Sequence, residues 1–452
     1  MDGQGKLKSK KIDQMVDREL CANLIIRHGL PFKFVEYQEL RTWISYLNPY
    51  ATLVSRNTIK SDISKIFMKE KIMLKEELKN ISSRICLTSN LWTSCTTEGY
   101  IALTTHYVDS NWKLKSKILN FCHLLLPHTG FELSKKINEC LHEWGIEERI
   151  FSLTLDHVSS NDVLIKTLKS QFVLQNSLIC DGEFFHVRCC AHILNLMVQE
   201  GLKVIGDTLN QIRESIKYVM GSESRMMKFK QCFEKIGDIN ALSALCVDVP
   251  TRWNSTFFML QSALKYQQVF SSLHLVDENY KYCPSEEKWK RVEKISAFLS
   301  PFYEITNLIS ASSYPTSNLY FLQVWNIQCL LMDSVKDEDE AIRDMAERMI
   351  VKFDKYWNEY SIVLAFGAIL VPRIKLETLG FCYERIDPLC WEVKLEKIKE
   401  KLYKLFSQYC TKNSTSPVLK RKHSDLSSFA TPSSFDVSYL LCSNLIIIVH
   451  IK

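Results

Sequence analysis

The sequence contains none of the short motifs that mark the common nucleotide, hydrolase and zinc-protease sites. It has no G-x-G-x-x-G, no G-x-x-x-x-G-K-[ST], no G-x-S-x-G and no H-E-x-x-H. At the level of motifs this excludes dinucleotide-binding, P-loop, α/β-hydrolase and zincin sites. It also has no C-x-x-C pair, so an autonomous zinc finger or zinc ribbon is not expected.

Glycine and proline are scarce as well, with 13 Gly and 11 Pro in 452 residues, which excludes a fibrous or linker-rich chain. The longest apolar run, residues 445–451, is too short to span a bilayer, and no signal-peptide pattern opens the sequence. We therefore expect no membrane partner. Sixteen cysteines spread over so long a chain indicate reduced thiols in an intracellular protein. The net charge of +6 permits an acidic partner such as nucleic acid without requiring one.

What the sequence does contain is organised around residues 184–196. Alternating apolar and polar residues predict a short strand, His186–Arg188, and helical spacing predicts a helix that starts near Cys190. Segments before this point are sheet-like from residue 84 onward, and the chain after it is almost entirely helical. The pattern indicates a sheet domain that is interrupted here by helices.

Residues 1–82 are predicted to form an N-terminal helical region. One helix covers residues 12–28 and ends at Gly29, since glycine is the usual residue at a helix C-terminus. A second covers residues 56–81, and its apolar face consists of Ile59, Ile63, Ile66 and Phe67.

The next hundred residues are predicted to alternate between strands and helices. Strands are expected at 84–91, 100–108, 112–126, 151–156 and 186–188, and helices at 131–144, at 161–172 and after 190. This order suits an α/β fold with a mixed sheet, in which ligand sites gather outside the carboxyl ends of strands.

Two polar residues lie at the ends of predicted strands, Asn90 on the first and Asp156 on the fourth. Two-metal phosphoryl transfer needs carboxylates from separate strands, because each divalent ion must be held between oxygens. Asp156 is placed for that role, although a strand-end turn or capping role is the alternative. Asn90 offers only a neutral carbonyl, which hard cations bind less well than a carboxylate.

Five ordered blocks of sequence resemble hAT-superfamily DNA transposases, in the plant branch usually found behind a BED zinc finger. The blocks are residues 87–94 (LTSNLWTS), 102–108 (ALTTHYV), Asp156 with 159–161 (SSN), 186–196 (HVRCCAHILNL) and 248–255 (DVPTRWNS). The resemblance runs from about residue 12 to about residue 408. It implies an RNase H-like mixed sheet interrupted by a large all-helical insertion, with an N-terminal helical region.

The domains expected on this basis are a helical region (1–82), the first part of the RNase H-like core (83–203), and the insertion with its following helices (204–408). Residues 409–452 follow as a low-complexity tail, rich in Ser, Thr and Lys over 411–434. Such a composition is typical of a disordered segment. A truncated reading frame is the alternative origin of this tail.

The resemblance also implies a set of catalytic acids, two Asp and one Glu, that bind Mg²⁺ or Mn²⁺. Asn90 stands where the first acid of the family lies, and Asp156 corresponds to the second. The family's Glu comes in a C-terminal dimerisation segment, and the sequence leaves the family pattern near Gln408. We therefore expect that segment and the BED finger to be absent and no metal cofactor to be bound, with Mg²⁺ or Mn²⁺ involved only if activity persists.

For DNA contacts, the resemblance places the C-x-x-H pair Cys189 and His192 near DNA at the junction of sheet and insertion. A buried thiol with a helix-capping histidine is the alternative. Trp253 matches a family tryptophan that stacks on a flipped base, and Arg252 and Asn254 flank it. The alternative for Trp253 is a core residue at the start of a helix.

A basic stretch follows the helix that starts near Cys190, formed by Arg213, Lys217, Arg225, Lys228 and Lys230. Interleaved glutamates favour a solvated helical surface over a face that follows phosphates.

Three functions are consistent with the sequence. The first is a nuclear, DNA-binding transposase relative that has lost catalysis. The second is an active transposase subunit completed by another chain, either a full-length transposase-like partner or a second copy in a homo-oligomer. The third is a protein-interaction scaffold that does not bind DNA.

Overall fold

The computed structural model describes residues 13–49, 51–94, 98–124, 129–156, 159–236, 245–310 and 317–413. The chain divides into two compact units, Met1–Ile81 and Ser82–Lys452. Helix α15 (Trp391–Asn413) extends past residue 408, so the tail predicted from residue 409 begins as helix, and the rest of it lies outside the described residues.

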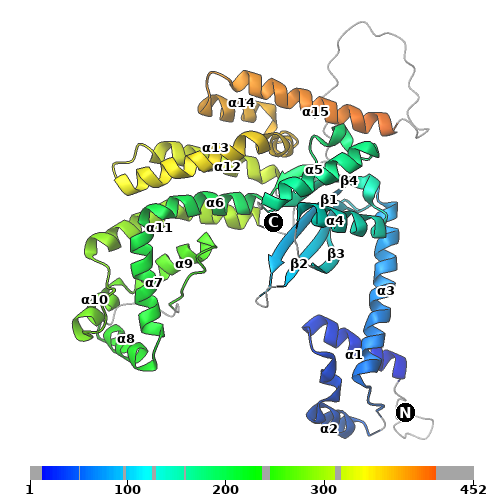
Figure 1. Ribbon diagram of the computed structural model, residues 1–452, viewed down its shortest axis with the longest axis horizontal. Coiled ribbons are helices and arrows are strands. Elements are labelled where there is room, and N and C mark those ends of the chain that lie inside the picture. The colour runs from blue at the N-terminus through cyan, green and yellow to red at the C-terminus, as the bar shows by residue number, and fades with distance from the viewer. Residues whose placement is uncertain are drawn as a thin grey trace, which may run out of the picture. The chain divides into compact units, whose positions relative to one another are not determined.

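The first unit is a small helical bundle whose core lies between its first and third helices (Figure 1). Gly29 ends α1 in the left-handed region with φ 61°, as predicted. The side chains of Ala22 and Ile59 are fully buried, but Phe67 is 60% exposed, so its predicted place on the apolar face is wrong. Phe67 comes eight residues after the fully buried Ile59 and so lies about 80° around the helix from it, at the margin of that face. The helices are α1 (Gln14–His28), α2 (Gln38–Leu47) and α3 (Arg56–Asn80), with a 3₁₀ turn at Phe32–Glu36.

The second unit begins with a five-stranded mixed sheet in the order β3-β2-β1-β4-β5. The first three strands are antiparallel, whereas β1, β4 and β5 run parallel, and the predicted order of elements is confirmed. The strands are β1 (Ile85–Thr93), β2 (Gly99–Val108), β3 (Leu114–Leu124), β4 (Ile150–Leu155) and β5 (His186–Arg188).

Two helices, α4 (Gly130–Trp144) and α5 (Ser159–Leu174), pack against each other beside the sheet. The Asn120 amide on β3 donates to Cys140 Sγ on α4 over 2.8 Å, which fixes this helix to one face of the sheet. All six residues of β4 are buried. The centre of the sheet is therefore covered on both faces, as expected for parallel strands.

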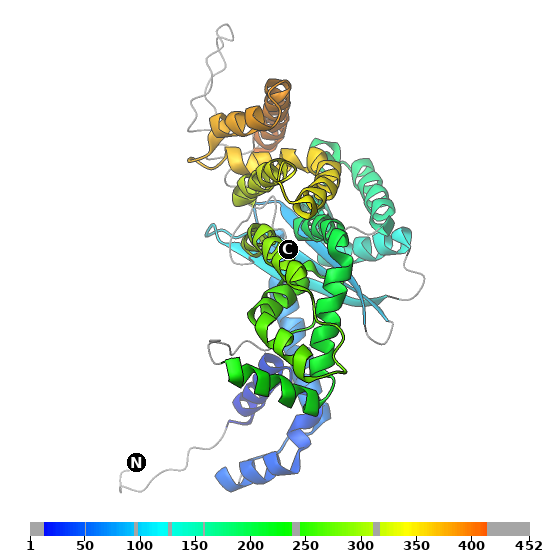
Figure 2. The ribbon, with the colours of Figure 1, turned by 90° about the vertical axis from the view of Figure 1, so that its left-hand side faces the viewer.

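Beyond β5 the described ranges contain helices and loops but no strand, in line with the prediction. The helices between residues 206 and 309 extend away from the sheet, whereas later helices pack next to β5 (Figures 1 and 2). One hydrophobic core joins the two parts, since it includes Val187 on β5 as well as Met197, Phe257 and Phe366 on helices. No helix in the described ranges combines the length and apolar character needed to cross a membrane. These helices are α6 (Cys190–Leu202), α7 (Gly206–Met220), α8 (Glu223–Ile236), α9 (Trp253–Lys265), α10 (Gln267–Val276), α11 (Glu286–Ile309), α12 (Ser317–Ser334), α13 (Glu340–Ile369), α14 (Lys375–Ile386) and α15 (Trp391–Asn413). Shorter 3₁₀ turns lie at Glu147–Arg149, Ile179–Gly182 and Lys203–Ile205.

Candidate nucleic-acid interface

Three residues singled out from the sequence lie in a row at one edge of the sheet. In the parallel register Ser89 pairs with Leu155, so the next residues, Asn90 and Asp156, are neighbours at the carboxyl end of β4, beyond which β1 continues to Thr93. On the other side of β4, the Cys189 N–H donates to the Leu155 carbonyl over 2.9 Å, which brings Cys189 beside Asp156. Asn90 near the end of β1, Asp156 after β4 and Cys189 after β5 therefore lie side by side at the carboxyl edge of the parallel strands.

The Asp156 carboxylate is held in place by the helix that follows it. Asn161 is 4% exposed, and its Nδ2 donates to both the backbone carbonyl and Oδ1 of Asp156, over 2.7 and 2.9 Å. Asp156 itself is half-buried, whereas Asn90 is exposed. One carboxylate oxygen of Asp156 therefore accepts a hydrogen bond from the Asn161 amide. Asn90, the neighbouring residue on β1, has a neutral amide where a pair of metal ions would need a second carboxylate.

The charge of Asp156 affects the pKa values of both Cys189 and His192, the C-x-x-H pair. Burial raises the pKa of the Cys189 thiol, and Asp156 raises it further. Burial also lowers the pKa of the His192 imidazole, against the opposing effect of Asp156. Burial therefore favours the neutral form of both side chains.

These donors do not fit a pair of magnesium ions. Hard divalent cations prefer several charged oxygen ligands, and here a single carboxylate lies beside an amide, a thiol and an imidazole. Within the ranges that the structure describes, no group of three His, Cys, Asp or Glu residues is arranged to hold a metal.

The block at residues 248–255 is bound to the helix that starts at the sheet edge. Asn195 Nδ2 donates to the Thr251 carbonyl over 3.1 Å, and Asn195 Oδ1 accepts from the Trp253 N–H over 3.0 Å. Gln199 lies one turn further along α6 and donates to the Pro250 carbonyl over 2.8 Å. Two blocks that are far apart in the sequence thus form one structural element.

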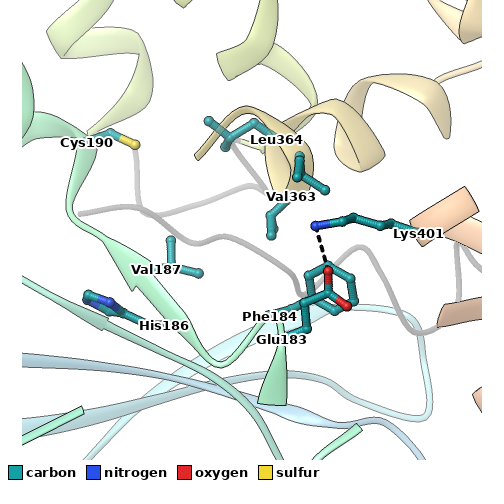
Figure 3. A pocket seen from close by; sticks show the side chains of 9 residues that line it. Glu183, Phe184, His186, Val187, Cys190, Val363, Leu364 and Lys401 are labelled. Carbon is teal, nitrogen blue, oxygen red and sulfur yellow. Dashed lines mark ion pairs between the residues drawn. The ribbon is translucent and has the colours of Figure 1, made fainter. Parts of the chain in front are cut away.

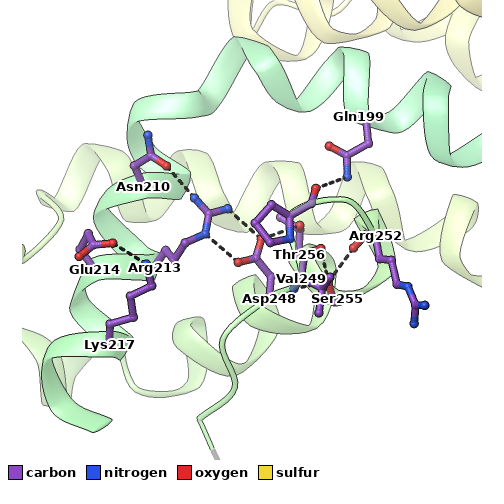
Figure 4. Close-up of polar contacts among 11 residues, drawn as sticks. Gln199, Asn210, Arg213, Glu214, Lys217, Asp248, Val249, Arg252, Ser255 and Thr256 are labelled. Atoms are coloured by element: carbon purple, nitrogen blue, oxygen red, sulfur yellow. Dashed lines mark hydrogen bonds and ion pairs between the residues drawn. The ribbon is translucent and has the colours of Figure 1, made fainter. Parts of the chain in front are cut away.

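A buried ion pair anchors the start of the same block (Figure 4). Arg213 on α7 donates from Nε and Nη2 to the two carboxylate oxygens of Asp248, over 2.7 and 2.8 Å, and Thr256 donates to Oδ2 over 2.8 Å. The Asp248 side chain is 0% exposed. Arg213 therefore stabilises the fold, which corrects its predicted place on a solvated basic surface.

Trp253 lies in the core in this structure. It is the first residue of α9, is 2% exposed, and its ring centroid lies 6.2 Å from that of Phe257. In this conformation the ring has no free face, so stacking on a base would require it to leave the core. Arg252 is exposed and its guanidinium points away from the Asp248 network (Figure 4). Asn254 is half-buried, and its Oδ1 is buried without a hydrogen-bond partner among the described residues.

A small cavity of about 100 Å³ lies between β5, α13 and α15 (Figure 3). Apolar side chains, including Phe184, Val187 and Leu364, form much of its lining. Its charged residues, Glu183 and Lys401, form an ion pair of 2.6 Å. Few polar groups converge there, so the strand edge is the better candidate site.

Sequence reasoning included Asn161, Asn195 and Asp248 in its blocks and Arg213 in the basic stretch, but it did not predict the contacts by which they hold the site together, and it missed Gln199. Asn195 and Gln199 are four residues apart on one helix and so share a face, a spacing visible in the sequence. Arg213 and Asp248 are 35 residues apart in the sequence, and no local sequence pattern indicates that they pair.

Three family models match consecutive parts of the chain. The ZBED1 RNase-like domain matches residues 88–184, the ZBED1 RNase-like helical domain matches 187–298, and the hAT-like transposase, RNase-H fold, matches 318–409. The first match ends two residues before β5 and the second begins within it. The predicted interruption of an RNase H-like sheet by helices is thereby confirmed.

Curated plant proteins are similar over most of the chain. Zinc finger BED domain-containing protein RICESLEEPER 2 of Oryza sativa subsp. japonica is 35% identical over 398 residues, which are 88% of this chain and 55% of the relative. Putative AC transposase of Zea mays is 32% identical over 419 residues, 92% of this chain and 52% of the relative. Zinc finger BED domain-containing protein DAYSLEEPER of Arabidopsis thaliana is 31% identical over 392 residues, 87% of this chain and 56% of the relative.

The chain thus spans about half the length of the curated relatives that it matches. The matched regions cover the sheet, the edge with Asn90 and Asp156, and the helices that follow. Because the chain has the RNase H-like sheet followed by helices and matches these family models and relatives, it belongs to the hAT transposase-like family.

Proposed function

We propose that this chain is a nuclear DNA-binding protein of the hAT transposase-like family in which metal-dependent strand cleavage has been lost. The observation that supports the loss of cleavage is the neutral amide of Asn90. It lies directly beside Asp156 at the carboxyl edge of the parallel strands, where a two-metal mechanism needs a second carboxylate. Removal of one charged ligand from such a site costs several kcal/mol of transition-state stabilisation, which is orders of magnitude in rate.

DNA binding is supported by the family and by the charge of the chain. The net charge is +6, which is the sign that phosphate binding requires. Arg252 is an exposed cation on a loop that α6 holds rigidly. Such a preordered cation can contact a phosphate without first losing an internal partner.

Binding to duplex DNA should weaken steeply with salt. Each phosphate neutralised by a cation releases counterions, so log K falls linearly with log salt, with a slope of about −0.9 per contact. Fluorescence anisotropy of a labelled duplex at two salt concentrations measures that slope. Arg252→Ala should reduce its magnitude by about 1, and the exposed Lys230→Ala on α8 serves as the matched control. A chain that binds no duplex even at low salt is instead a scaffold for proteins.

Restoring the acid should restore metal binding. Asn90→Asp places a second carboxylate next to Asp156, and affinity for hard cations rises with ligand charge. Titration with Mn²⁺ followed by electron paramagnetic resonance should show at least about tenfold tighter binding for Asn90→Asp than for the wild type. The double variant Asn90→Asp, Asp156→Ala should return to the wild-type level.

The wild-type chain with Mg²⁺ or Mn²⁺ should not nick a duplex. Nicking that disappears in Asp156→Ala would show that catalysis is retained. Nicking that appears only when a full-length transposase-like chain is added would assign this chain to a composite enzyme.

A further inference from the structure

Four aromatic side chains form a cluster on the sheet, next to the candidate site. The Trp92 and Tyr100 rings are stacked with centroids 6.1 Å apart, and the Phe121 centroid lies 5.4 Å from Trp92 and 5.5 Å from Tyr100. His123 completes the group, 5.4 Å from Tyr100. We call these four residues the aromatic platform.

The strand register places this platform on the same face of the sheet as Asn90. Side chains two residues apart on a strand share a face, so Trp92 lies on the face of Asn90. Asn90 pairs with Ala102 and Ala102 with Phe121, while Trp92 pairs with Tyr100 and Tyr100 with His123. The platform therefore occupies two adjacent rows across β1, β2 and β3, and one of these rows begins at Asn90.

The platform is open to solvent although it consists of large aromatic rings. Trp92 is 39% exposed and Phe121 is 60% exposed, and His123 is also exposed. Helix α4 contacts β3 through Asn120, the residue before Phe121, whose side chain points to the opposite face of a strand. The same sheet is thus covered by a helix on one face and offers bare rings on the other.

These residue types suit an unpaired nucleobase. Every base has a π-face that stacks on an aromatic side chain, and its edge then forms hydrogen bonds with a nearby amide. The Tyr100 hydroxyl already donates to Glu98 over 2.7 Å, so this residue offers its ring. The exposed Asn90 offers both a donor and an acceptor, which is the pairing that asparagine makes with adenine.

We propose that the aromatic platform binds unpaired bases of a DNA strand that lies across the Asn90–Asp156 edge. The bases stack on Trp92 and Phe121, and the Asn90 amide contacts a base edge. The inference rests on the proposed DNA binding and deepens it, because it assigns base contacts to the sheet. In the same structure Trp253 is 2% exposed and offers no such surface.

The test compares strands with and without bases. Anisotropy is measured with the full chain on labelled oligothymidine, on an abasic strand of equal length and on a duplex. We expect the wild type to prefer the base-bearing strand over the abasic strand by about 5- to 150-fold per stacked base. Trp92→Ala should lose this preference while it retains its affinity for the abasic strand and the duplex.

The chain offers a matched control in Trp112. This tryptophan is 55% exposed at the turn between β2 and β3 and lies outside the platform. Trp112→Ala removes an exposed ring of the same kind from the opposite end of these strands, and it should bind all three DNAs as the wild type does. Trp92→Leu keeps apolar bulk without the π-face and should behave as Trp92→Ala, which separates lost stacking from damage to the fold.

The outcomes are distinguishable from a failure of DNA binding itself. If the wild type binds none of the three DNAs, the proposed function fails. If it binds the duplex but does not distinguish base-bearing from abasic strands, or if Trp92→Ala matches Trp112→Ala, the platform assignment is overturned and DNA binding stands. If Trp92→Ala only converts a dimer into a monomer in sedimentation, the platform is a contact between copies of this chain and the assignment is likewise overturned.

Discussion

Replacing Asp248 with alanine is expected to lower the free energy of unfolding by about 3–5 kcal/mol. The Asp248 side chain is 0% exposed and accepts two hydrogen bonds from Arg213 and one from Thr256. Its removal leaves the Arg213 guanidinium, itself only 16% exposed, without its counter-charge. A buried charge that has lost its partner cannot recover full hydration, which is the source of the cost. Urea unfolding followed by circular dichroism measures the change.

Two further variants show whether the loss comes from burial of the pair. Arg213→Met combined with Asp248→Ala removes both charges and should destabilise the chain less than Asp248→Ala alone. Glu286→Ala breaks a pair of 2.8 Å with Lys290 in which the side chains are 70% and 78% exposed, and it should change nothing measurable. If Asp248→Ala cost no more than Glu286→Ala, the pair would not anchor the loop at residues 248–255.

The same carboxylate should make stability depend on pH on the acidic side. Burial alone would raise the pKa of Asp248, but hydrogen bonds from Arg213 and Thr256 outweigh burial and lower it. A carboxylate whose pKa is lower in the folded chain contributes stability above its unfolded pKa, about 3.9, and loses that contribution as the pH falls through the folded pKa. Below pH 4 the wild type should therefore lose stability toward the level of Asp248→Asn, which lacks this titration.

Local patterns in the sequence predicted the elements that position the site. Residue alternation gave β5 as His186–Arg188 and helical spacing gave a helix starting at Cys190, both as observed. Gly29 was recognised as the end of α1 because few other residues adopt a positive φ at low cost. The proximity of Asn90 and Asp156 was also accessible, since Asn90 lies near the end of the first predicted strand and Asp156 at the end of the fourth, and parallel strands end at a common edge.

Features that depend on register or on partners far along the chain could not be predicted in this way. The aromatic platform forms because the strand register pairs Trp92 with Tyr100 and Tyr100 with His123. This register cannot be read from the sequence. The role of Arg213 depends on Asp248, which a loop brings back from 35 residues away. Phe67 is a large apolar residue, yet it lies at the margin of the apolar face of α3 and outside the core cluster of its unit.

Trp253→Ala is the other substitution with a large expected effect, a loss of about 3–5 kcal/mol in the free energy of unfolding. The ring is 2% exposed and lies against Phe257 inside the core that joins the sheet to the helices. Its removal leaves a cavity that a well-packed interior closes only in part. The backbone N–H of residue 253, which Asn195 binds, stays in place in the variant. Urea unfolding monitored by far-UV circular dichroism, which reports on helix content, measures the loss.

Trp253→Leu separates a role in the core from a role in base stacking. Leucine retains much of the apolar volume and leaves a smaller cavity than alanine, so it should cost about 1–3 kcal/mol and the chain stays folded. It has no π-face, and a base that stacked on Trp253 would therefore bind this variant about 5- to 150-fold more weakly. Since the ring is enclosed by the core, we expect Trp253→Leu to bind oligothymidine and duplex DNA as the wild type does. A selective loss of oligothymidine affinity in this variant, with Trp92→Ala unaffected, would instead mean that the core at the start of α9 opens and that Trp253 is the residue that stacks.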